Sequence, residues 1–171
     1  MFKHLLKHLS KYNILSKSQF GFLKGSDIEK AIYTYSENVL NSLDNKLEAT
    51  GIFCDLSKAF DCGNHSILLS KLKYYGVTCR TADWFESYLT NRKQRVPLHN
   101  TSSVGNQASS DWEVIKCGVP QGSILGPLLF LVYIDYLSSV TLSDAKFVLF
   151  ADDTNIAISS KSNMNLERAA N

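Results

Sequence analysis

The sequence has few cysteines and no long apolar run. Its four cysteines form no C-x-x-C pair and none of the paired spacings that are typical of zinc sites. The segment between Lys3 and Lys7 contains only two leucines, so the N-terminal segment lacks the apolar core of a signal peptide. The longest apolar stretch, residues 124–134, is interrupted by Gly126 and Pro127 and is too short to span a bilayer. These absences predict a reduced intracellular protein with no membrane segment.

Charge of one sign is also scarce, since 18 Lys and Arg face 16 Asp and Glu for a formal net charge of +2. The bases are nevertheless concentrated. Residues 1–30 contain six lysines and two acids, and residues 71–95 contain six basic residues and two acids. Acids outnumber bases elsewhere. Two basic flanks around an acidic centre suit a polyanion held on either side of a metal site. A solvated surface of uneven charge is the alternative explanation.

The pattern of apolar residues predicts an α+β fold with antiparallel pairing. The chain has 44% hydrophobic residues in 171, which is enough for the core of one domain. Strands are expected at 50–56 and on both sides of Asp152, the first of them buried on both faces. A long hairpin is expected near 92–117. Helices are expected over residues 2–13, from Ile28 to Leu43, over 65–75 and 81–90, and from Ser123 or Leu128 to Leu137.

Two acidic spots follow apolar runs that ought to be buried. Asp55 ends the run Gly-Ile-Phe-Cys, and Asp152 with Asp153 follows Phe-Val-Leu-Phe-Ala at the tip of an expected hairpin. If the two strands are neighbours, three carboxylates meet at one edge of the sheet, and bound cations must offset their repulsion. Hard oxygen ligands suit Mg²⁺, and two such ions would form a phosphoryl-transfer site. An Asp pair in a turn is more often ordinary turn chemistry.

Four motifs surround these acids in order along the chain. They are Gln19-Phe-Gly-Phe-Leu-Lys-Gly25, Phe53-Cys-Asp-Leu-Ser-Lys-Ala-Phe-Asp61, Gly118-Val-Pro-Gln-Gly-Ser-Ile-Leu-Gly-Pro-Leu-Leu-Phe130 and Phe150-Ala-Asp-Asp153. Together they resemble the reverse transcriptases of non-LTR (LINE-type, jockey-like) retrotransposons, and the resemblance runs from about Leu6 to Ile158. Group II intron maturases and telomerases are the related alternatives, but the Asp-Leu-Ser-Lys-Ala-Phe-Asp and Ser-Ile-Leu-Gly-Pro-Leu-Leu-Phe strings favour the LINE lineage.

The resemblance implies a partial reverse transcriptase domain over residues 1–171. We expect the palm of a right-hand polymerase with partial fingers, an antiparallel sheet packed on helices, and no thumb. The fingers part is expected at about 1–50, the palm at about 51–160 with an inserted hairpin near 92–117, and a truncated tail at 161–171.

The implied activity is RNA-directed DNA synthesis, in which deoxynucleotides from dNTPs are added to a DNA primer 3′-hydroxyl along an RNA template. Asp55, with help from the backbone carbonyl of Leu56, is implied to bind metal. Asp152 and Asp153 are implied to complete the catalytic triad around two Mg²⁺ ions, with Mn²⁺ as an alternative. A catalytically inactive remnant that at most binds RNA stays open as the rival interpretation.

Further residues match nucleotide-contacting positions of the family. Phe60 matches the aromatic gate that excludes a ribose 2′-hydroxyl, and Gln121 with Gly122 matches the segment that touches the incoming nucleotide. The basic residues expected to meet template or primer phosphates are Lys24, Arg92, Lys93 and Arg95. Asp61 and His65 are interpreted as structural residues rather than an acid–base pair. The oligomeric state cannot be deduced from these patterns.

Overall fold

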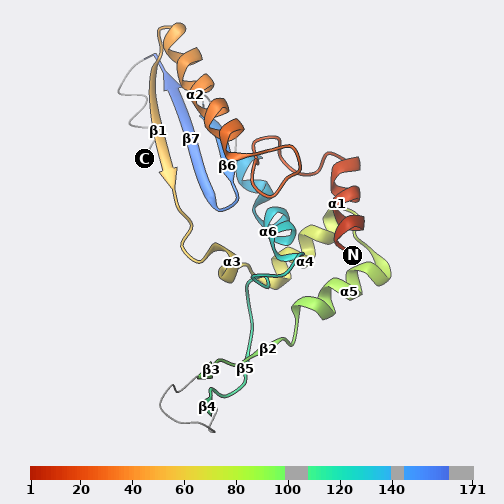
Figure 1. Cartoon of the computed structure of the whole chain (residues 1–171). Helices are drawn as coiled ribbons and strands as arrows, with labels where there is room; N and C mark the ends of the chain where they lie inside the picture. The colour runs from red at the N-terminus through yellow and green to blue at the C-terminus, as the bar shows by residue number, and fades with distance from the viewer. Residues whose placement is uncertain (99–107, 140–144, 162–171) are drawn as a thin grey trace.

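The computed structural model describes residues 1–98, 108–139 and 145–161. Its central element is an antiparallel sheet of three strands in the order β1–β7–β6 (Figure 1). These strands are β1 (Glu48–Cys54), β6 (Ala145–Phe150) and β7 (Asp153–Ser160). The α+β class and the antiparallel pairing predicted from the sequence are therefore confirmed.

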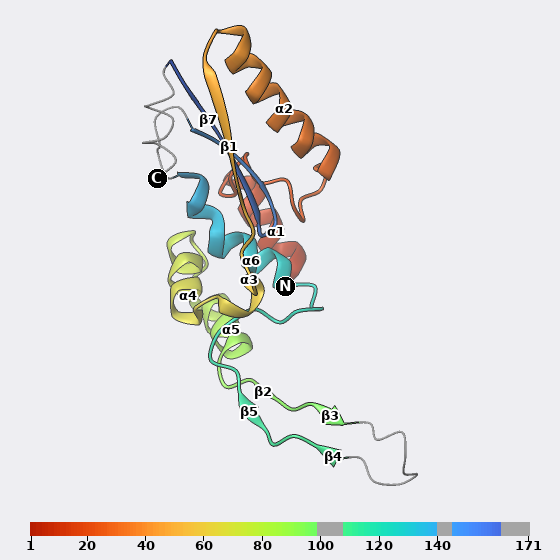
Figure 2. The ribbon, with the colours of Figure 1, turned by 90° about the vertical axis from the view of Figure 1, so that its left-hand side faces the viewer.

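Helix α2 (Ile28–Asp44) covers one face of this sheet, as Figures 1 and 2 both show. The helix begins where the Asp27 side chain accepts a hydrogen bond from the backbone N–H of Lys30 at 2.8 Å. Ala31 of the helix packs with Phe20 and Val148 in a small buried cluster. This cluster fixes the sheet against the segment that precedes α2.

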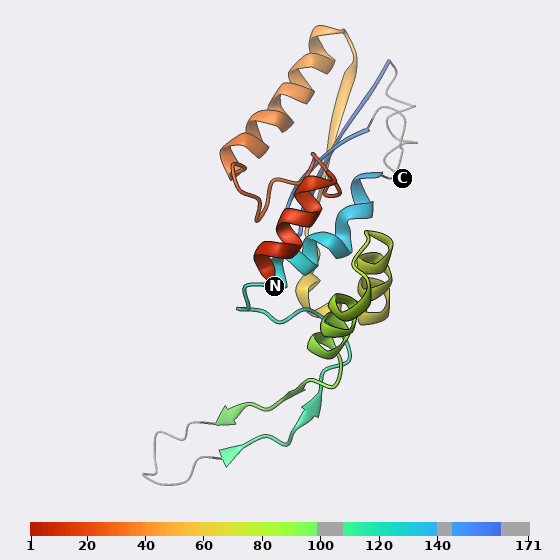
Figure 3. The same cartoon turned by 90° about the vertical axis from the view of Figure 1, so that its right-hand side faces the viewer.

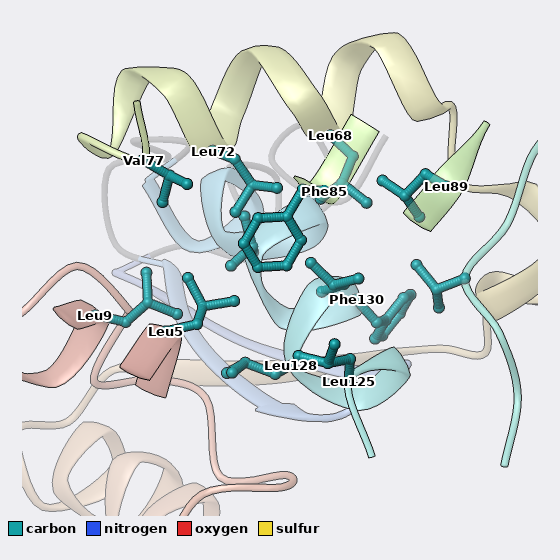
Figure 4. Close-up of a cluster of buried hydrophobic side chains, with 13 residues drawn as sticks. Leu5, Leu9, Leu68, Leu72, Val77, Phe85, Leu89, Leu125, Leu128 and Phe130 are labelled. Carbon is teal, nitrogen blue, oxygen red and sulfur yellow. The ribbon is translucent and has the colours of Figure 1, made fainter. Parts of the chain in front are cut away.

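A second and larger core lies among four other helices (Figure 4). They are α1 (Phe2–Lys11), α4 (His65–Tyr74), α5 (Cys79–Leu89) and α6 (Gly126–Ile134). Leu9, Leu72, Phe85 and Leu129 from these helices are almost fully buried there. Figure 3 shows α1 and α6 lying side by side within this group. Two short helical segments, α3 (Ala59–Cys62) and a 3₁₀ turn η1 (Asp135–Ser139), complete the helical part.

A narrow hairpin extends away from the rest of the molecule (Figure 2). It is built from two short ladders, in which β2 (Lys93–Gln94) pairs with β5 (Glu113–Val114) and β3 (Pro97–Leu98) pairs with β4 (Ala108–Ser109). The expected hairpin near 92–117 is present, and the part of it at 99–107 lies outside the described residues.

Three details of the sequence prediction are wrong. Strand β1 is not buried on both faces, because it lies at the edge of the sheet and Phe53 is 69% exposed. Only Asp152 is in the turn of the last hairpin, since Asp153 is already the first residue of β7. Ser123 does not begin α6. Its hydroxyl instead accepts a hydrogen bond from the N–H of Gly126, the first residue of that helix.

None of the helices in the described ranges is both long enough and apolar enough to cross a bilayer.

Candidate active site

The strand register brings the three predicted carboxylates to one end of the sheet. The last pair between β1 and β7 is Cys54 with Thr154. Asp55 directly follows this paired part of β1, and Asp153 directly precedes Thr154 at the start of β7. Asp152 precedes Asp153 in the tight turn from β6. Asp55 and Asp153 are exposed and Asp152 is half-buried.

These residues fit a magnesium site in their chemistry. All three donors are carboxylates. Mg²⁺ prefers oxygen ligands, and it usually keeps several of its bound waters when a protein holds it. Across residues 1–98, 108–139 and 145–161, however, no three His, Cys, Asp or Glu side chains are gathered closely enough to hold a metal ion. The sheet therefore supplies the right ligand type at one edge, without a closed set of ligands.

The turn that carries Asp152 has an unusual backbone. Ala151, its first residue, has a positive φ of 56°. A residue with a Cβ adopts this left-handed conformation at a cost of about 1–2 kcal/mol. The buried side chain of Gln19 holds Ala151 in place. Its Oε1 accepts from the N–H of Ala151 at 3.0 Å and its Nε2 donates to the carbonyl of Ala151 at 3.4 Å. Gln19 stands in the first family-like motif, but nothing in that motif predicts this contact.

Phe60 is packed between other aromatic rings. It lies in α3, five residues after Asp55. Its ring stacks on that of Phe130 with a centroid separation of 4.2 Å and meets the ring of Phe22 edge-on at 6.0 Å. Phe60 is half-buried. The predicted gate residue is thus fixed in orientation by α6 on one side and by the loop before α2 on the other.

The loop before α6 is attached to α3 through Gly118. The N–H of Gly118 donates to the carbonyl of Gly63, and that of Val119 donates to the carbonyl of Phe60, both at 2.7 Å. Gly118 has a φ of 83°, and a Cβ there would lie only 2.7 Å from the Cα of Asp61. Only glycine combines this backbone with so close an approach. The buried ring of His65 donates from Nε2 to the carbonyl of Gly118 at 2.7 Å, a contact that agrees with the structural interpretation of His65.

Gln121 contacts a residue that sequence reasoning treated as structural only. Its Nε2 donates to Oδ1 of Asp61 at 2.8 Å. Gly122 follows with a φ of 76° and with open space where a Cβ would stand. Asp61 and Gln121 also line a cavity of about 750 Å³ beneath the hairpin, together with Arg92, Glu113 and Lys116. The structure thus gives Asp61 a polar partner that the sequence alone did not reveal.

The four predicted basic residues are not all in one place. Lys24 is exposed in the loop before α2, whereas Arg92, Lys93 and Arg95 are on or beside β2. The guanidinium of Arg95 lies over the ring of Trp112, with 4.8 Å between its central carbon and the ring centroid. Both side chains are exposed. An exposed aromatic ring with a stacked arginine suits contact with bases and phosphates.

The fold is similar to that of two solved telomerase structures. Apo telomerase from Candida tropicalis, truncated from its C-terminal domain, matches with a TM-score of 0.61 and 18% sequence identity, over 99% of this chain and 34% of that chain. Telomerase from Candida albicans, in complex with a TWJ fragment of telomeric RNA, matches with a TM-score of 0.54 and 15% identity, over 99% of this chain and 31% of that chain. At these identities the likeness shows the fold alone.

The family follows from the sequence match. The chain belongs to the reverse transcriptase (RNA-dependent DNA polymerase) family, whose model matches residues 1–171. It is 32% identical over 164 residues to the probable RNA-directed DNA polymerase from transposon BS of Drosophila melanogaster, covering 89% of this chain. It is 34% identical over 160 residues to the RNA-directed DNA polymerase from mobile element jockey of the same organism, covering 86% of this chain. The predicted resemblance to jockey-like reverse transcriptases is therefore confirmed. The chain spans 17% and 16% of the lengths of these two relatives.

Proposed function

We propose that the chain forms the catalytic core of an RNA-directed DNA polymerase, which adds deoxynucleotides from dNTPs to a DNA primer along an RNA template. The observation that carries this proposal is that three acids stand at the same end of the sheet in a chain of the reverse transcriptase family. Asp55 directly follows β1, Asp152 is in the turn between β6 and β7, and Asp153 is the first residue of β7. Residues 51–160 would form the palm, residues 1–50 part of the fingers, and the hairpin near 92–117 an insertion.

The carboxylates of Asp55, Asp152 and Asp153, with the carbonyl of Leu56, would hold two Mg²⁺ or Mn²⁺ ions. When bound, such ions lower the pKa of the primer 3′-hydroxyl and stabilise charge on the leaving pyrophosphate. The protein's own contribution would be the strand ends, which bring the backbone of all three acids to one end of the sheet.

Phe60, Gln121 and Gly122 would contact the incoming nucleotide. The ring of Phe60 cannot move aside easily because Phe130 stacks on it, which is the property that a gate against a 2′-hydroxyl requires. The amide of Gln121 is held by Asp61 in the loop before α6. The open space at Gly122 would let the backbone approach a ligand closely.

The basic residues would hold nucleic acid through phosphates. Exposed charges are offered by Lys93 and Arg95 of the hairpin and by Lys24 near α2. Arg92, which precedes Lys93, is half-buried. Contacts of this kind do not depend on base sequence and weaken as salt concentration rises.

Primer extension tests the activity. The assay contains an RNA template, a DNA primer, dNTPs and Mg²⁺, and it is run on the chain alone and on the chain joined to the segments that follow the matched region in a relative. We expect Asp152→Asn to abolish product, while Asp44→Asn, at the far end of α2, leaves it unchanged. Full activity in Asp152→Asn would contradict the proposal. In the same assay Phe60→Val should admit ribonucleotides, and unchanged discrimination would count against the gate.

Binding of RNA without catalysis is the second candidate, and the exposed pair of Arg95 and Trp112 favours it. Fluorescence anisotropy with labelled single-stranded RNA separates the two functions. Salt-sensitive binding, together with no extension product from either form of the chain, would support a binding fragment.

A further inference from the structure

The segment before α2 is paired with the strand that leads into the acidic turn. The N–H of Phe20 donates to the carbonyl of Leu149, and the N–H of Leu149 donates to the carbonyl of Ser18, both at 2.8 Å. Gln19 thereby forms a parallel bridge with Leu149 at the outer edge of β6. Two hydrogen bonds on either side of Gln19 fix where its side chain starts.

That side chain reaches the turn. Gln19 is 5% exposed, and its Oε1 accepts from two backbone groups, the N–H of Gly21 at 2.7 Å and the N–H of Ala151 at 3.0 Å. Its Nε2 donates back to the carbonyl of Ala151. The buried side chain of Gln19 therefore satisfies both the N–H and the carbonyl of Ala151, whose φ is positive. Leaving those groups unpaired in a buried position would be costly.

Gly21 makes this approach possible. A Cβ at Gly21 would lie 2.3 Å from the backbone nitrogen of Ala151 and 2.9 Å from its Cα. Both of these are backbone atoms that cannot rotate away. A side chain at position 21 would therefore push the turn and the preceding loop apart.

We infer that Gln19 and Gly21 are positioning residues that hold the turn at Ala151 and so set the direction of the Asp152 carboxylate. Asp152 follows Ala151 directly, so a change in the backbone of Ala151 swings that carboxylate. The inference rests on the proposed function for the role of Asp152, although the contacts of Gln19 do not. Gln19 and Gly21 of the first motif thus act on Asp152 through the backbone of Ala151.

The test compares four variants of the whole chain. Gln19→Met keeps the length of the side chain and removes all of its hydrogen bonds. Gln19→Glu keeps the acceptor oxygen for the N–H groups of Gly21 and Ala151. Gly21→Ala introduces the clash, and Leu9→Ala destabilises the helical core away from the turn. Two quantities are measured on each variant. The first is the hydrogen-exchange rate of the Ala151 amide. The second is the affinity for Mn²⁺, detected by the paramagnetic broadening of amide signals near the turn.

We expect Gln19→Met and Gly21→Ala to speed exchange at Ala151 on the order of tenfold relative to Leu9→Ala, because the amide loses its partner. We expect Gln19→Met and Gly21→Ala to weaken Mn²⁺ binding at the turn by a similar factor. We expect the Ala151 amide to exchange more slowly in Gln19→Glu than in Gln19→Met. Unchanged exchange, or unchanged Mn²⁺ affinity, in either folded variant overturns the inference.

Asp152→Asn separates this result from the proposed function. If Asp152→Asn leaves Mn²⁺ binding intact, the proposed metal site is wrong, whatever Gln19 does. If Asp152→Asn removes Mn²⁺ binding while Gln19→Met changes neither exchange nor affinity, the metal site stands and the positioning role is wrong.

Discussion

Gln121 donates a hydrogen bond from Nε2 to Oδ1 of Asp61 at 2.8 Å, which ties the loop before α6 to helix α3. Asp61 directly follows Phe60, so this bond connects the predicted gate with the predicted nucleotide-contacting loop. Both partners are exposed, and neither is needed to fill the core. The bond therefore orients the amide of Gln121 more than it stabilises the fold.

A double-mutant cycle of Asp61→Ala and Gln121→Ala measures this bond. We expect a coupling free energy of about 0.5–1 kcal/mol in chemical denaturation, since a hydrogen bond between exposed groups gains little net stability. Asp61→Asn keeps an acceptor and should preserve most of the coupling. Single-variant effects that simply add would show that the two side chains do not interact in solution.

Gly118→Ala should destabilise the fold far more than Gly122→Ala. Both glycines have a positive φ, but a Cβ at position 118 would meet the backbone of Asp61 whereas the space at 122 is open. We expect a loss of about 1–2 kcal/mol at 122 from the backbone conformation alone, and at least ~1–3 kcal/mol more at 118 from the clash. Equilibrium urea unfolding checks this, and equal losses would mean that the close contact with α3 is absent.

Leu72→Ala should reveal the weight of the helical core. Leu72 is almost fully buried on α4, while Ile67 on the same helix is 48% exposed. We expect Leu72→Ala to cost about 2–5 kcal/mol and Ile67→Ala less than about 1 kcal/mol. A scan of thermal unfolding on the two variants gives the comparison. Similar losses would place α4 in a different orientation.

Tyr75 should make the fold sensitive to alkaline pH. Burial, followed by the 2.9 Å hydrogen bond that its hydroxyl donates to Asp135, raises the pKa of Tyr75 above its ordinary value. In the unfolded chain a tyrosine releases its proton near pH 10. Above that pH the unfolded state binds fewer protons than the folded state, so the stability that Tyr75 contributes is lost as pH rises.

Denaturant midpoints between pH 8 and 11 test this expectation. Tyr75→Phe should be less stable than the unchanged chain at pH 8, because it loses the bond to Asp135, and should lose less of its remaining stability by pH 11. Tyr33 on α2 is 67% exposed, so Tyr33→Phe serves as the control and should follow the unchanged chain. Identical slopes for all three proteins would rule out a role for Tyr75.

The sequence predicted most of the elements because their patterns are local. The helix predicted from Ile28 to Leu43 runs from Ile28 to Asp44, with Asn45 as its C-cap. Helix α4 begins after Asn64, whose side chain accepts from the N–H groups of Ser66 and Ile67. The last hairpin also formed where two β-prone runs flank the acids. Short-range spacing carries this information without knowledge of the tertiary structure.

Long-range contacts were beyond the reach of the sequence. The exposure of Phe53 depends on β1 being the edge strand, which a run of apolar residues does not reveal. The bond of Gln19 to Ala151 joins residues 132 positions apart. Asp61 and Gln121 are 60 positions apart. In the candidate site, the motifs therefore predicted candidate residues, but not how the backbone and the polar partners hold them.

The two hydrophobic clusters affect how the candidate active site opens locally. Asp153 is in the sheet that packs on α2 and Asp152 is in the turn that leads to it, while Phe60 packs on Phe130 in the helical core. Units with separate cores can open independently, each with its own free energy. The distance of Phe60 from Asp152 and Asp153 then depends on how the sheet with α2 is packed against the helical core. Under the proposed function, a substitution deep in either core can change nucleotide selection without altering Phe60, Gln121 or Gly122.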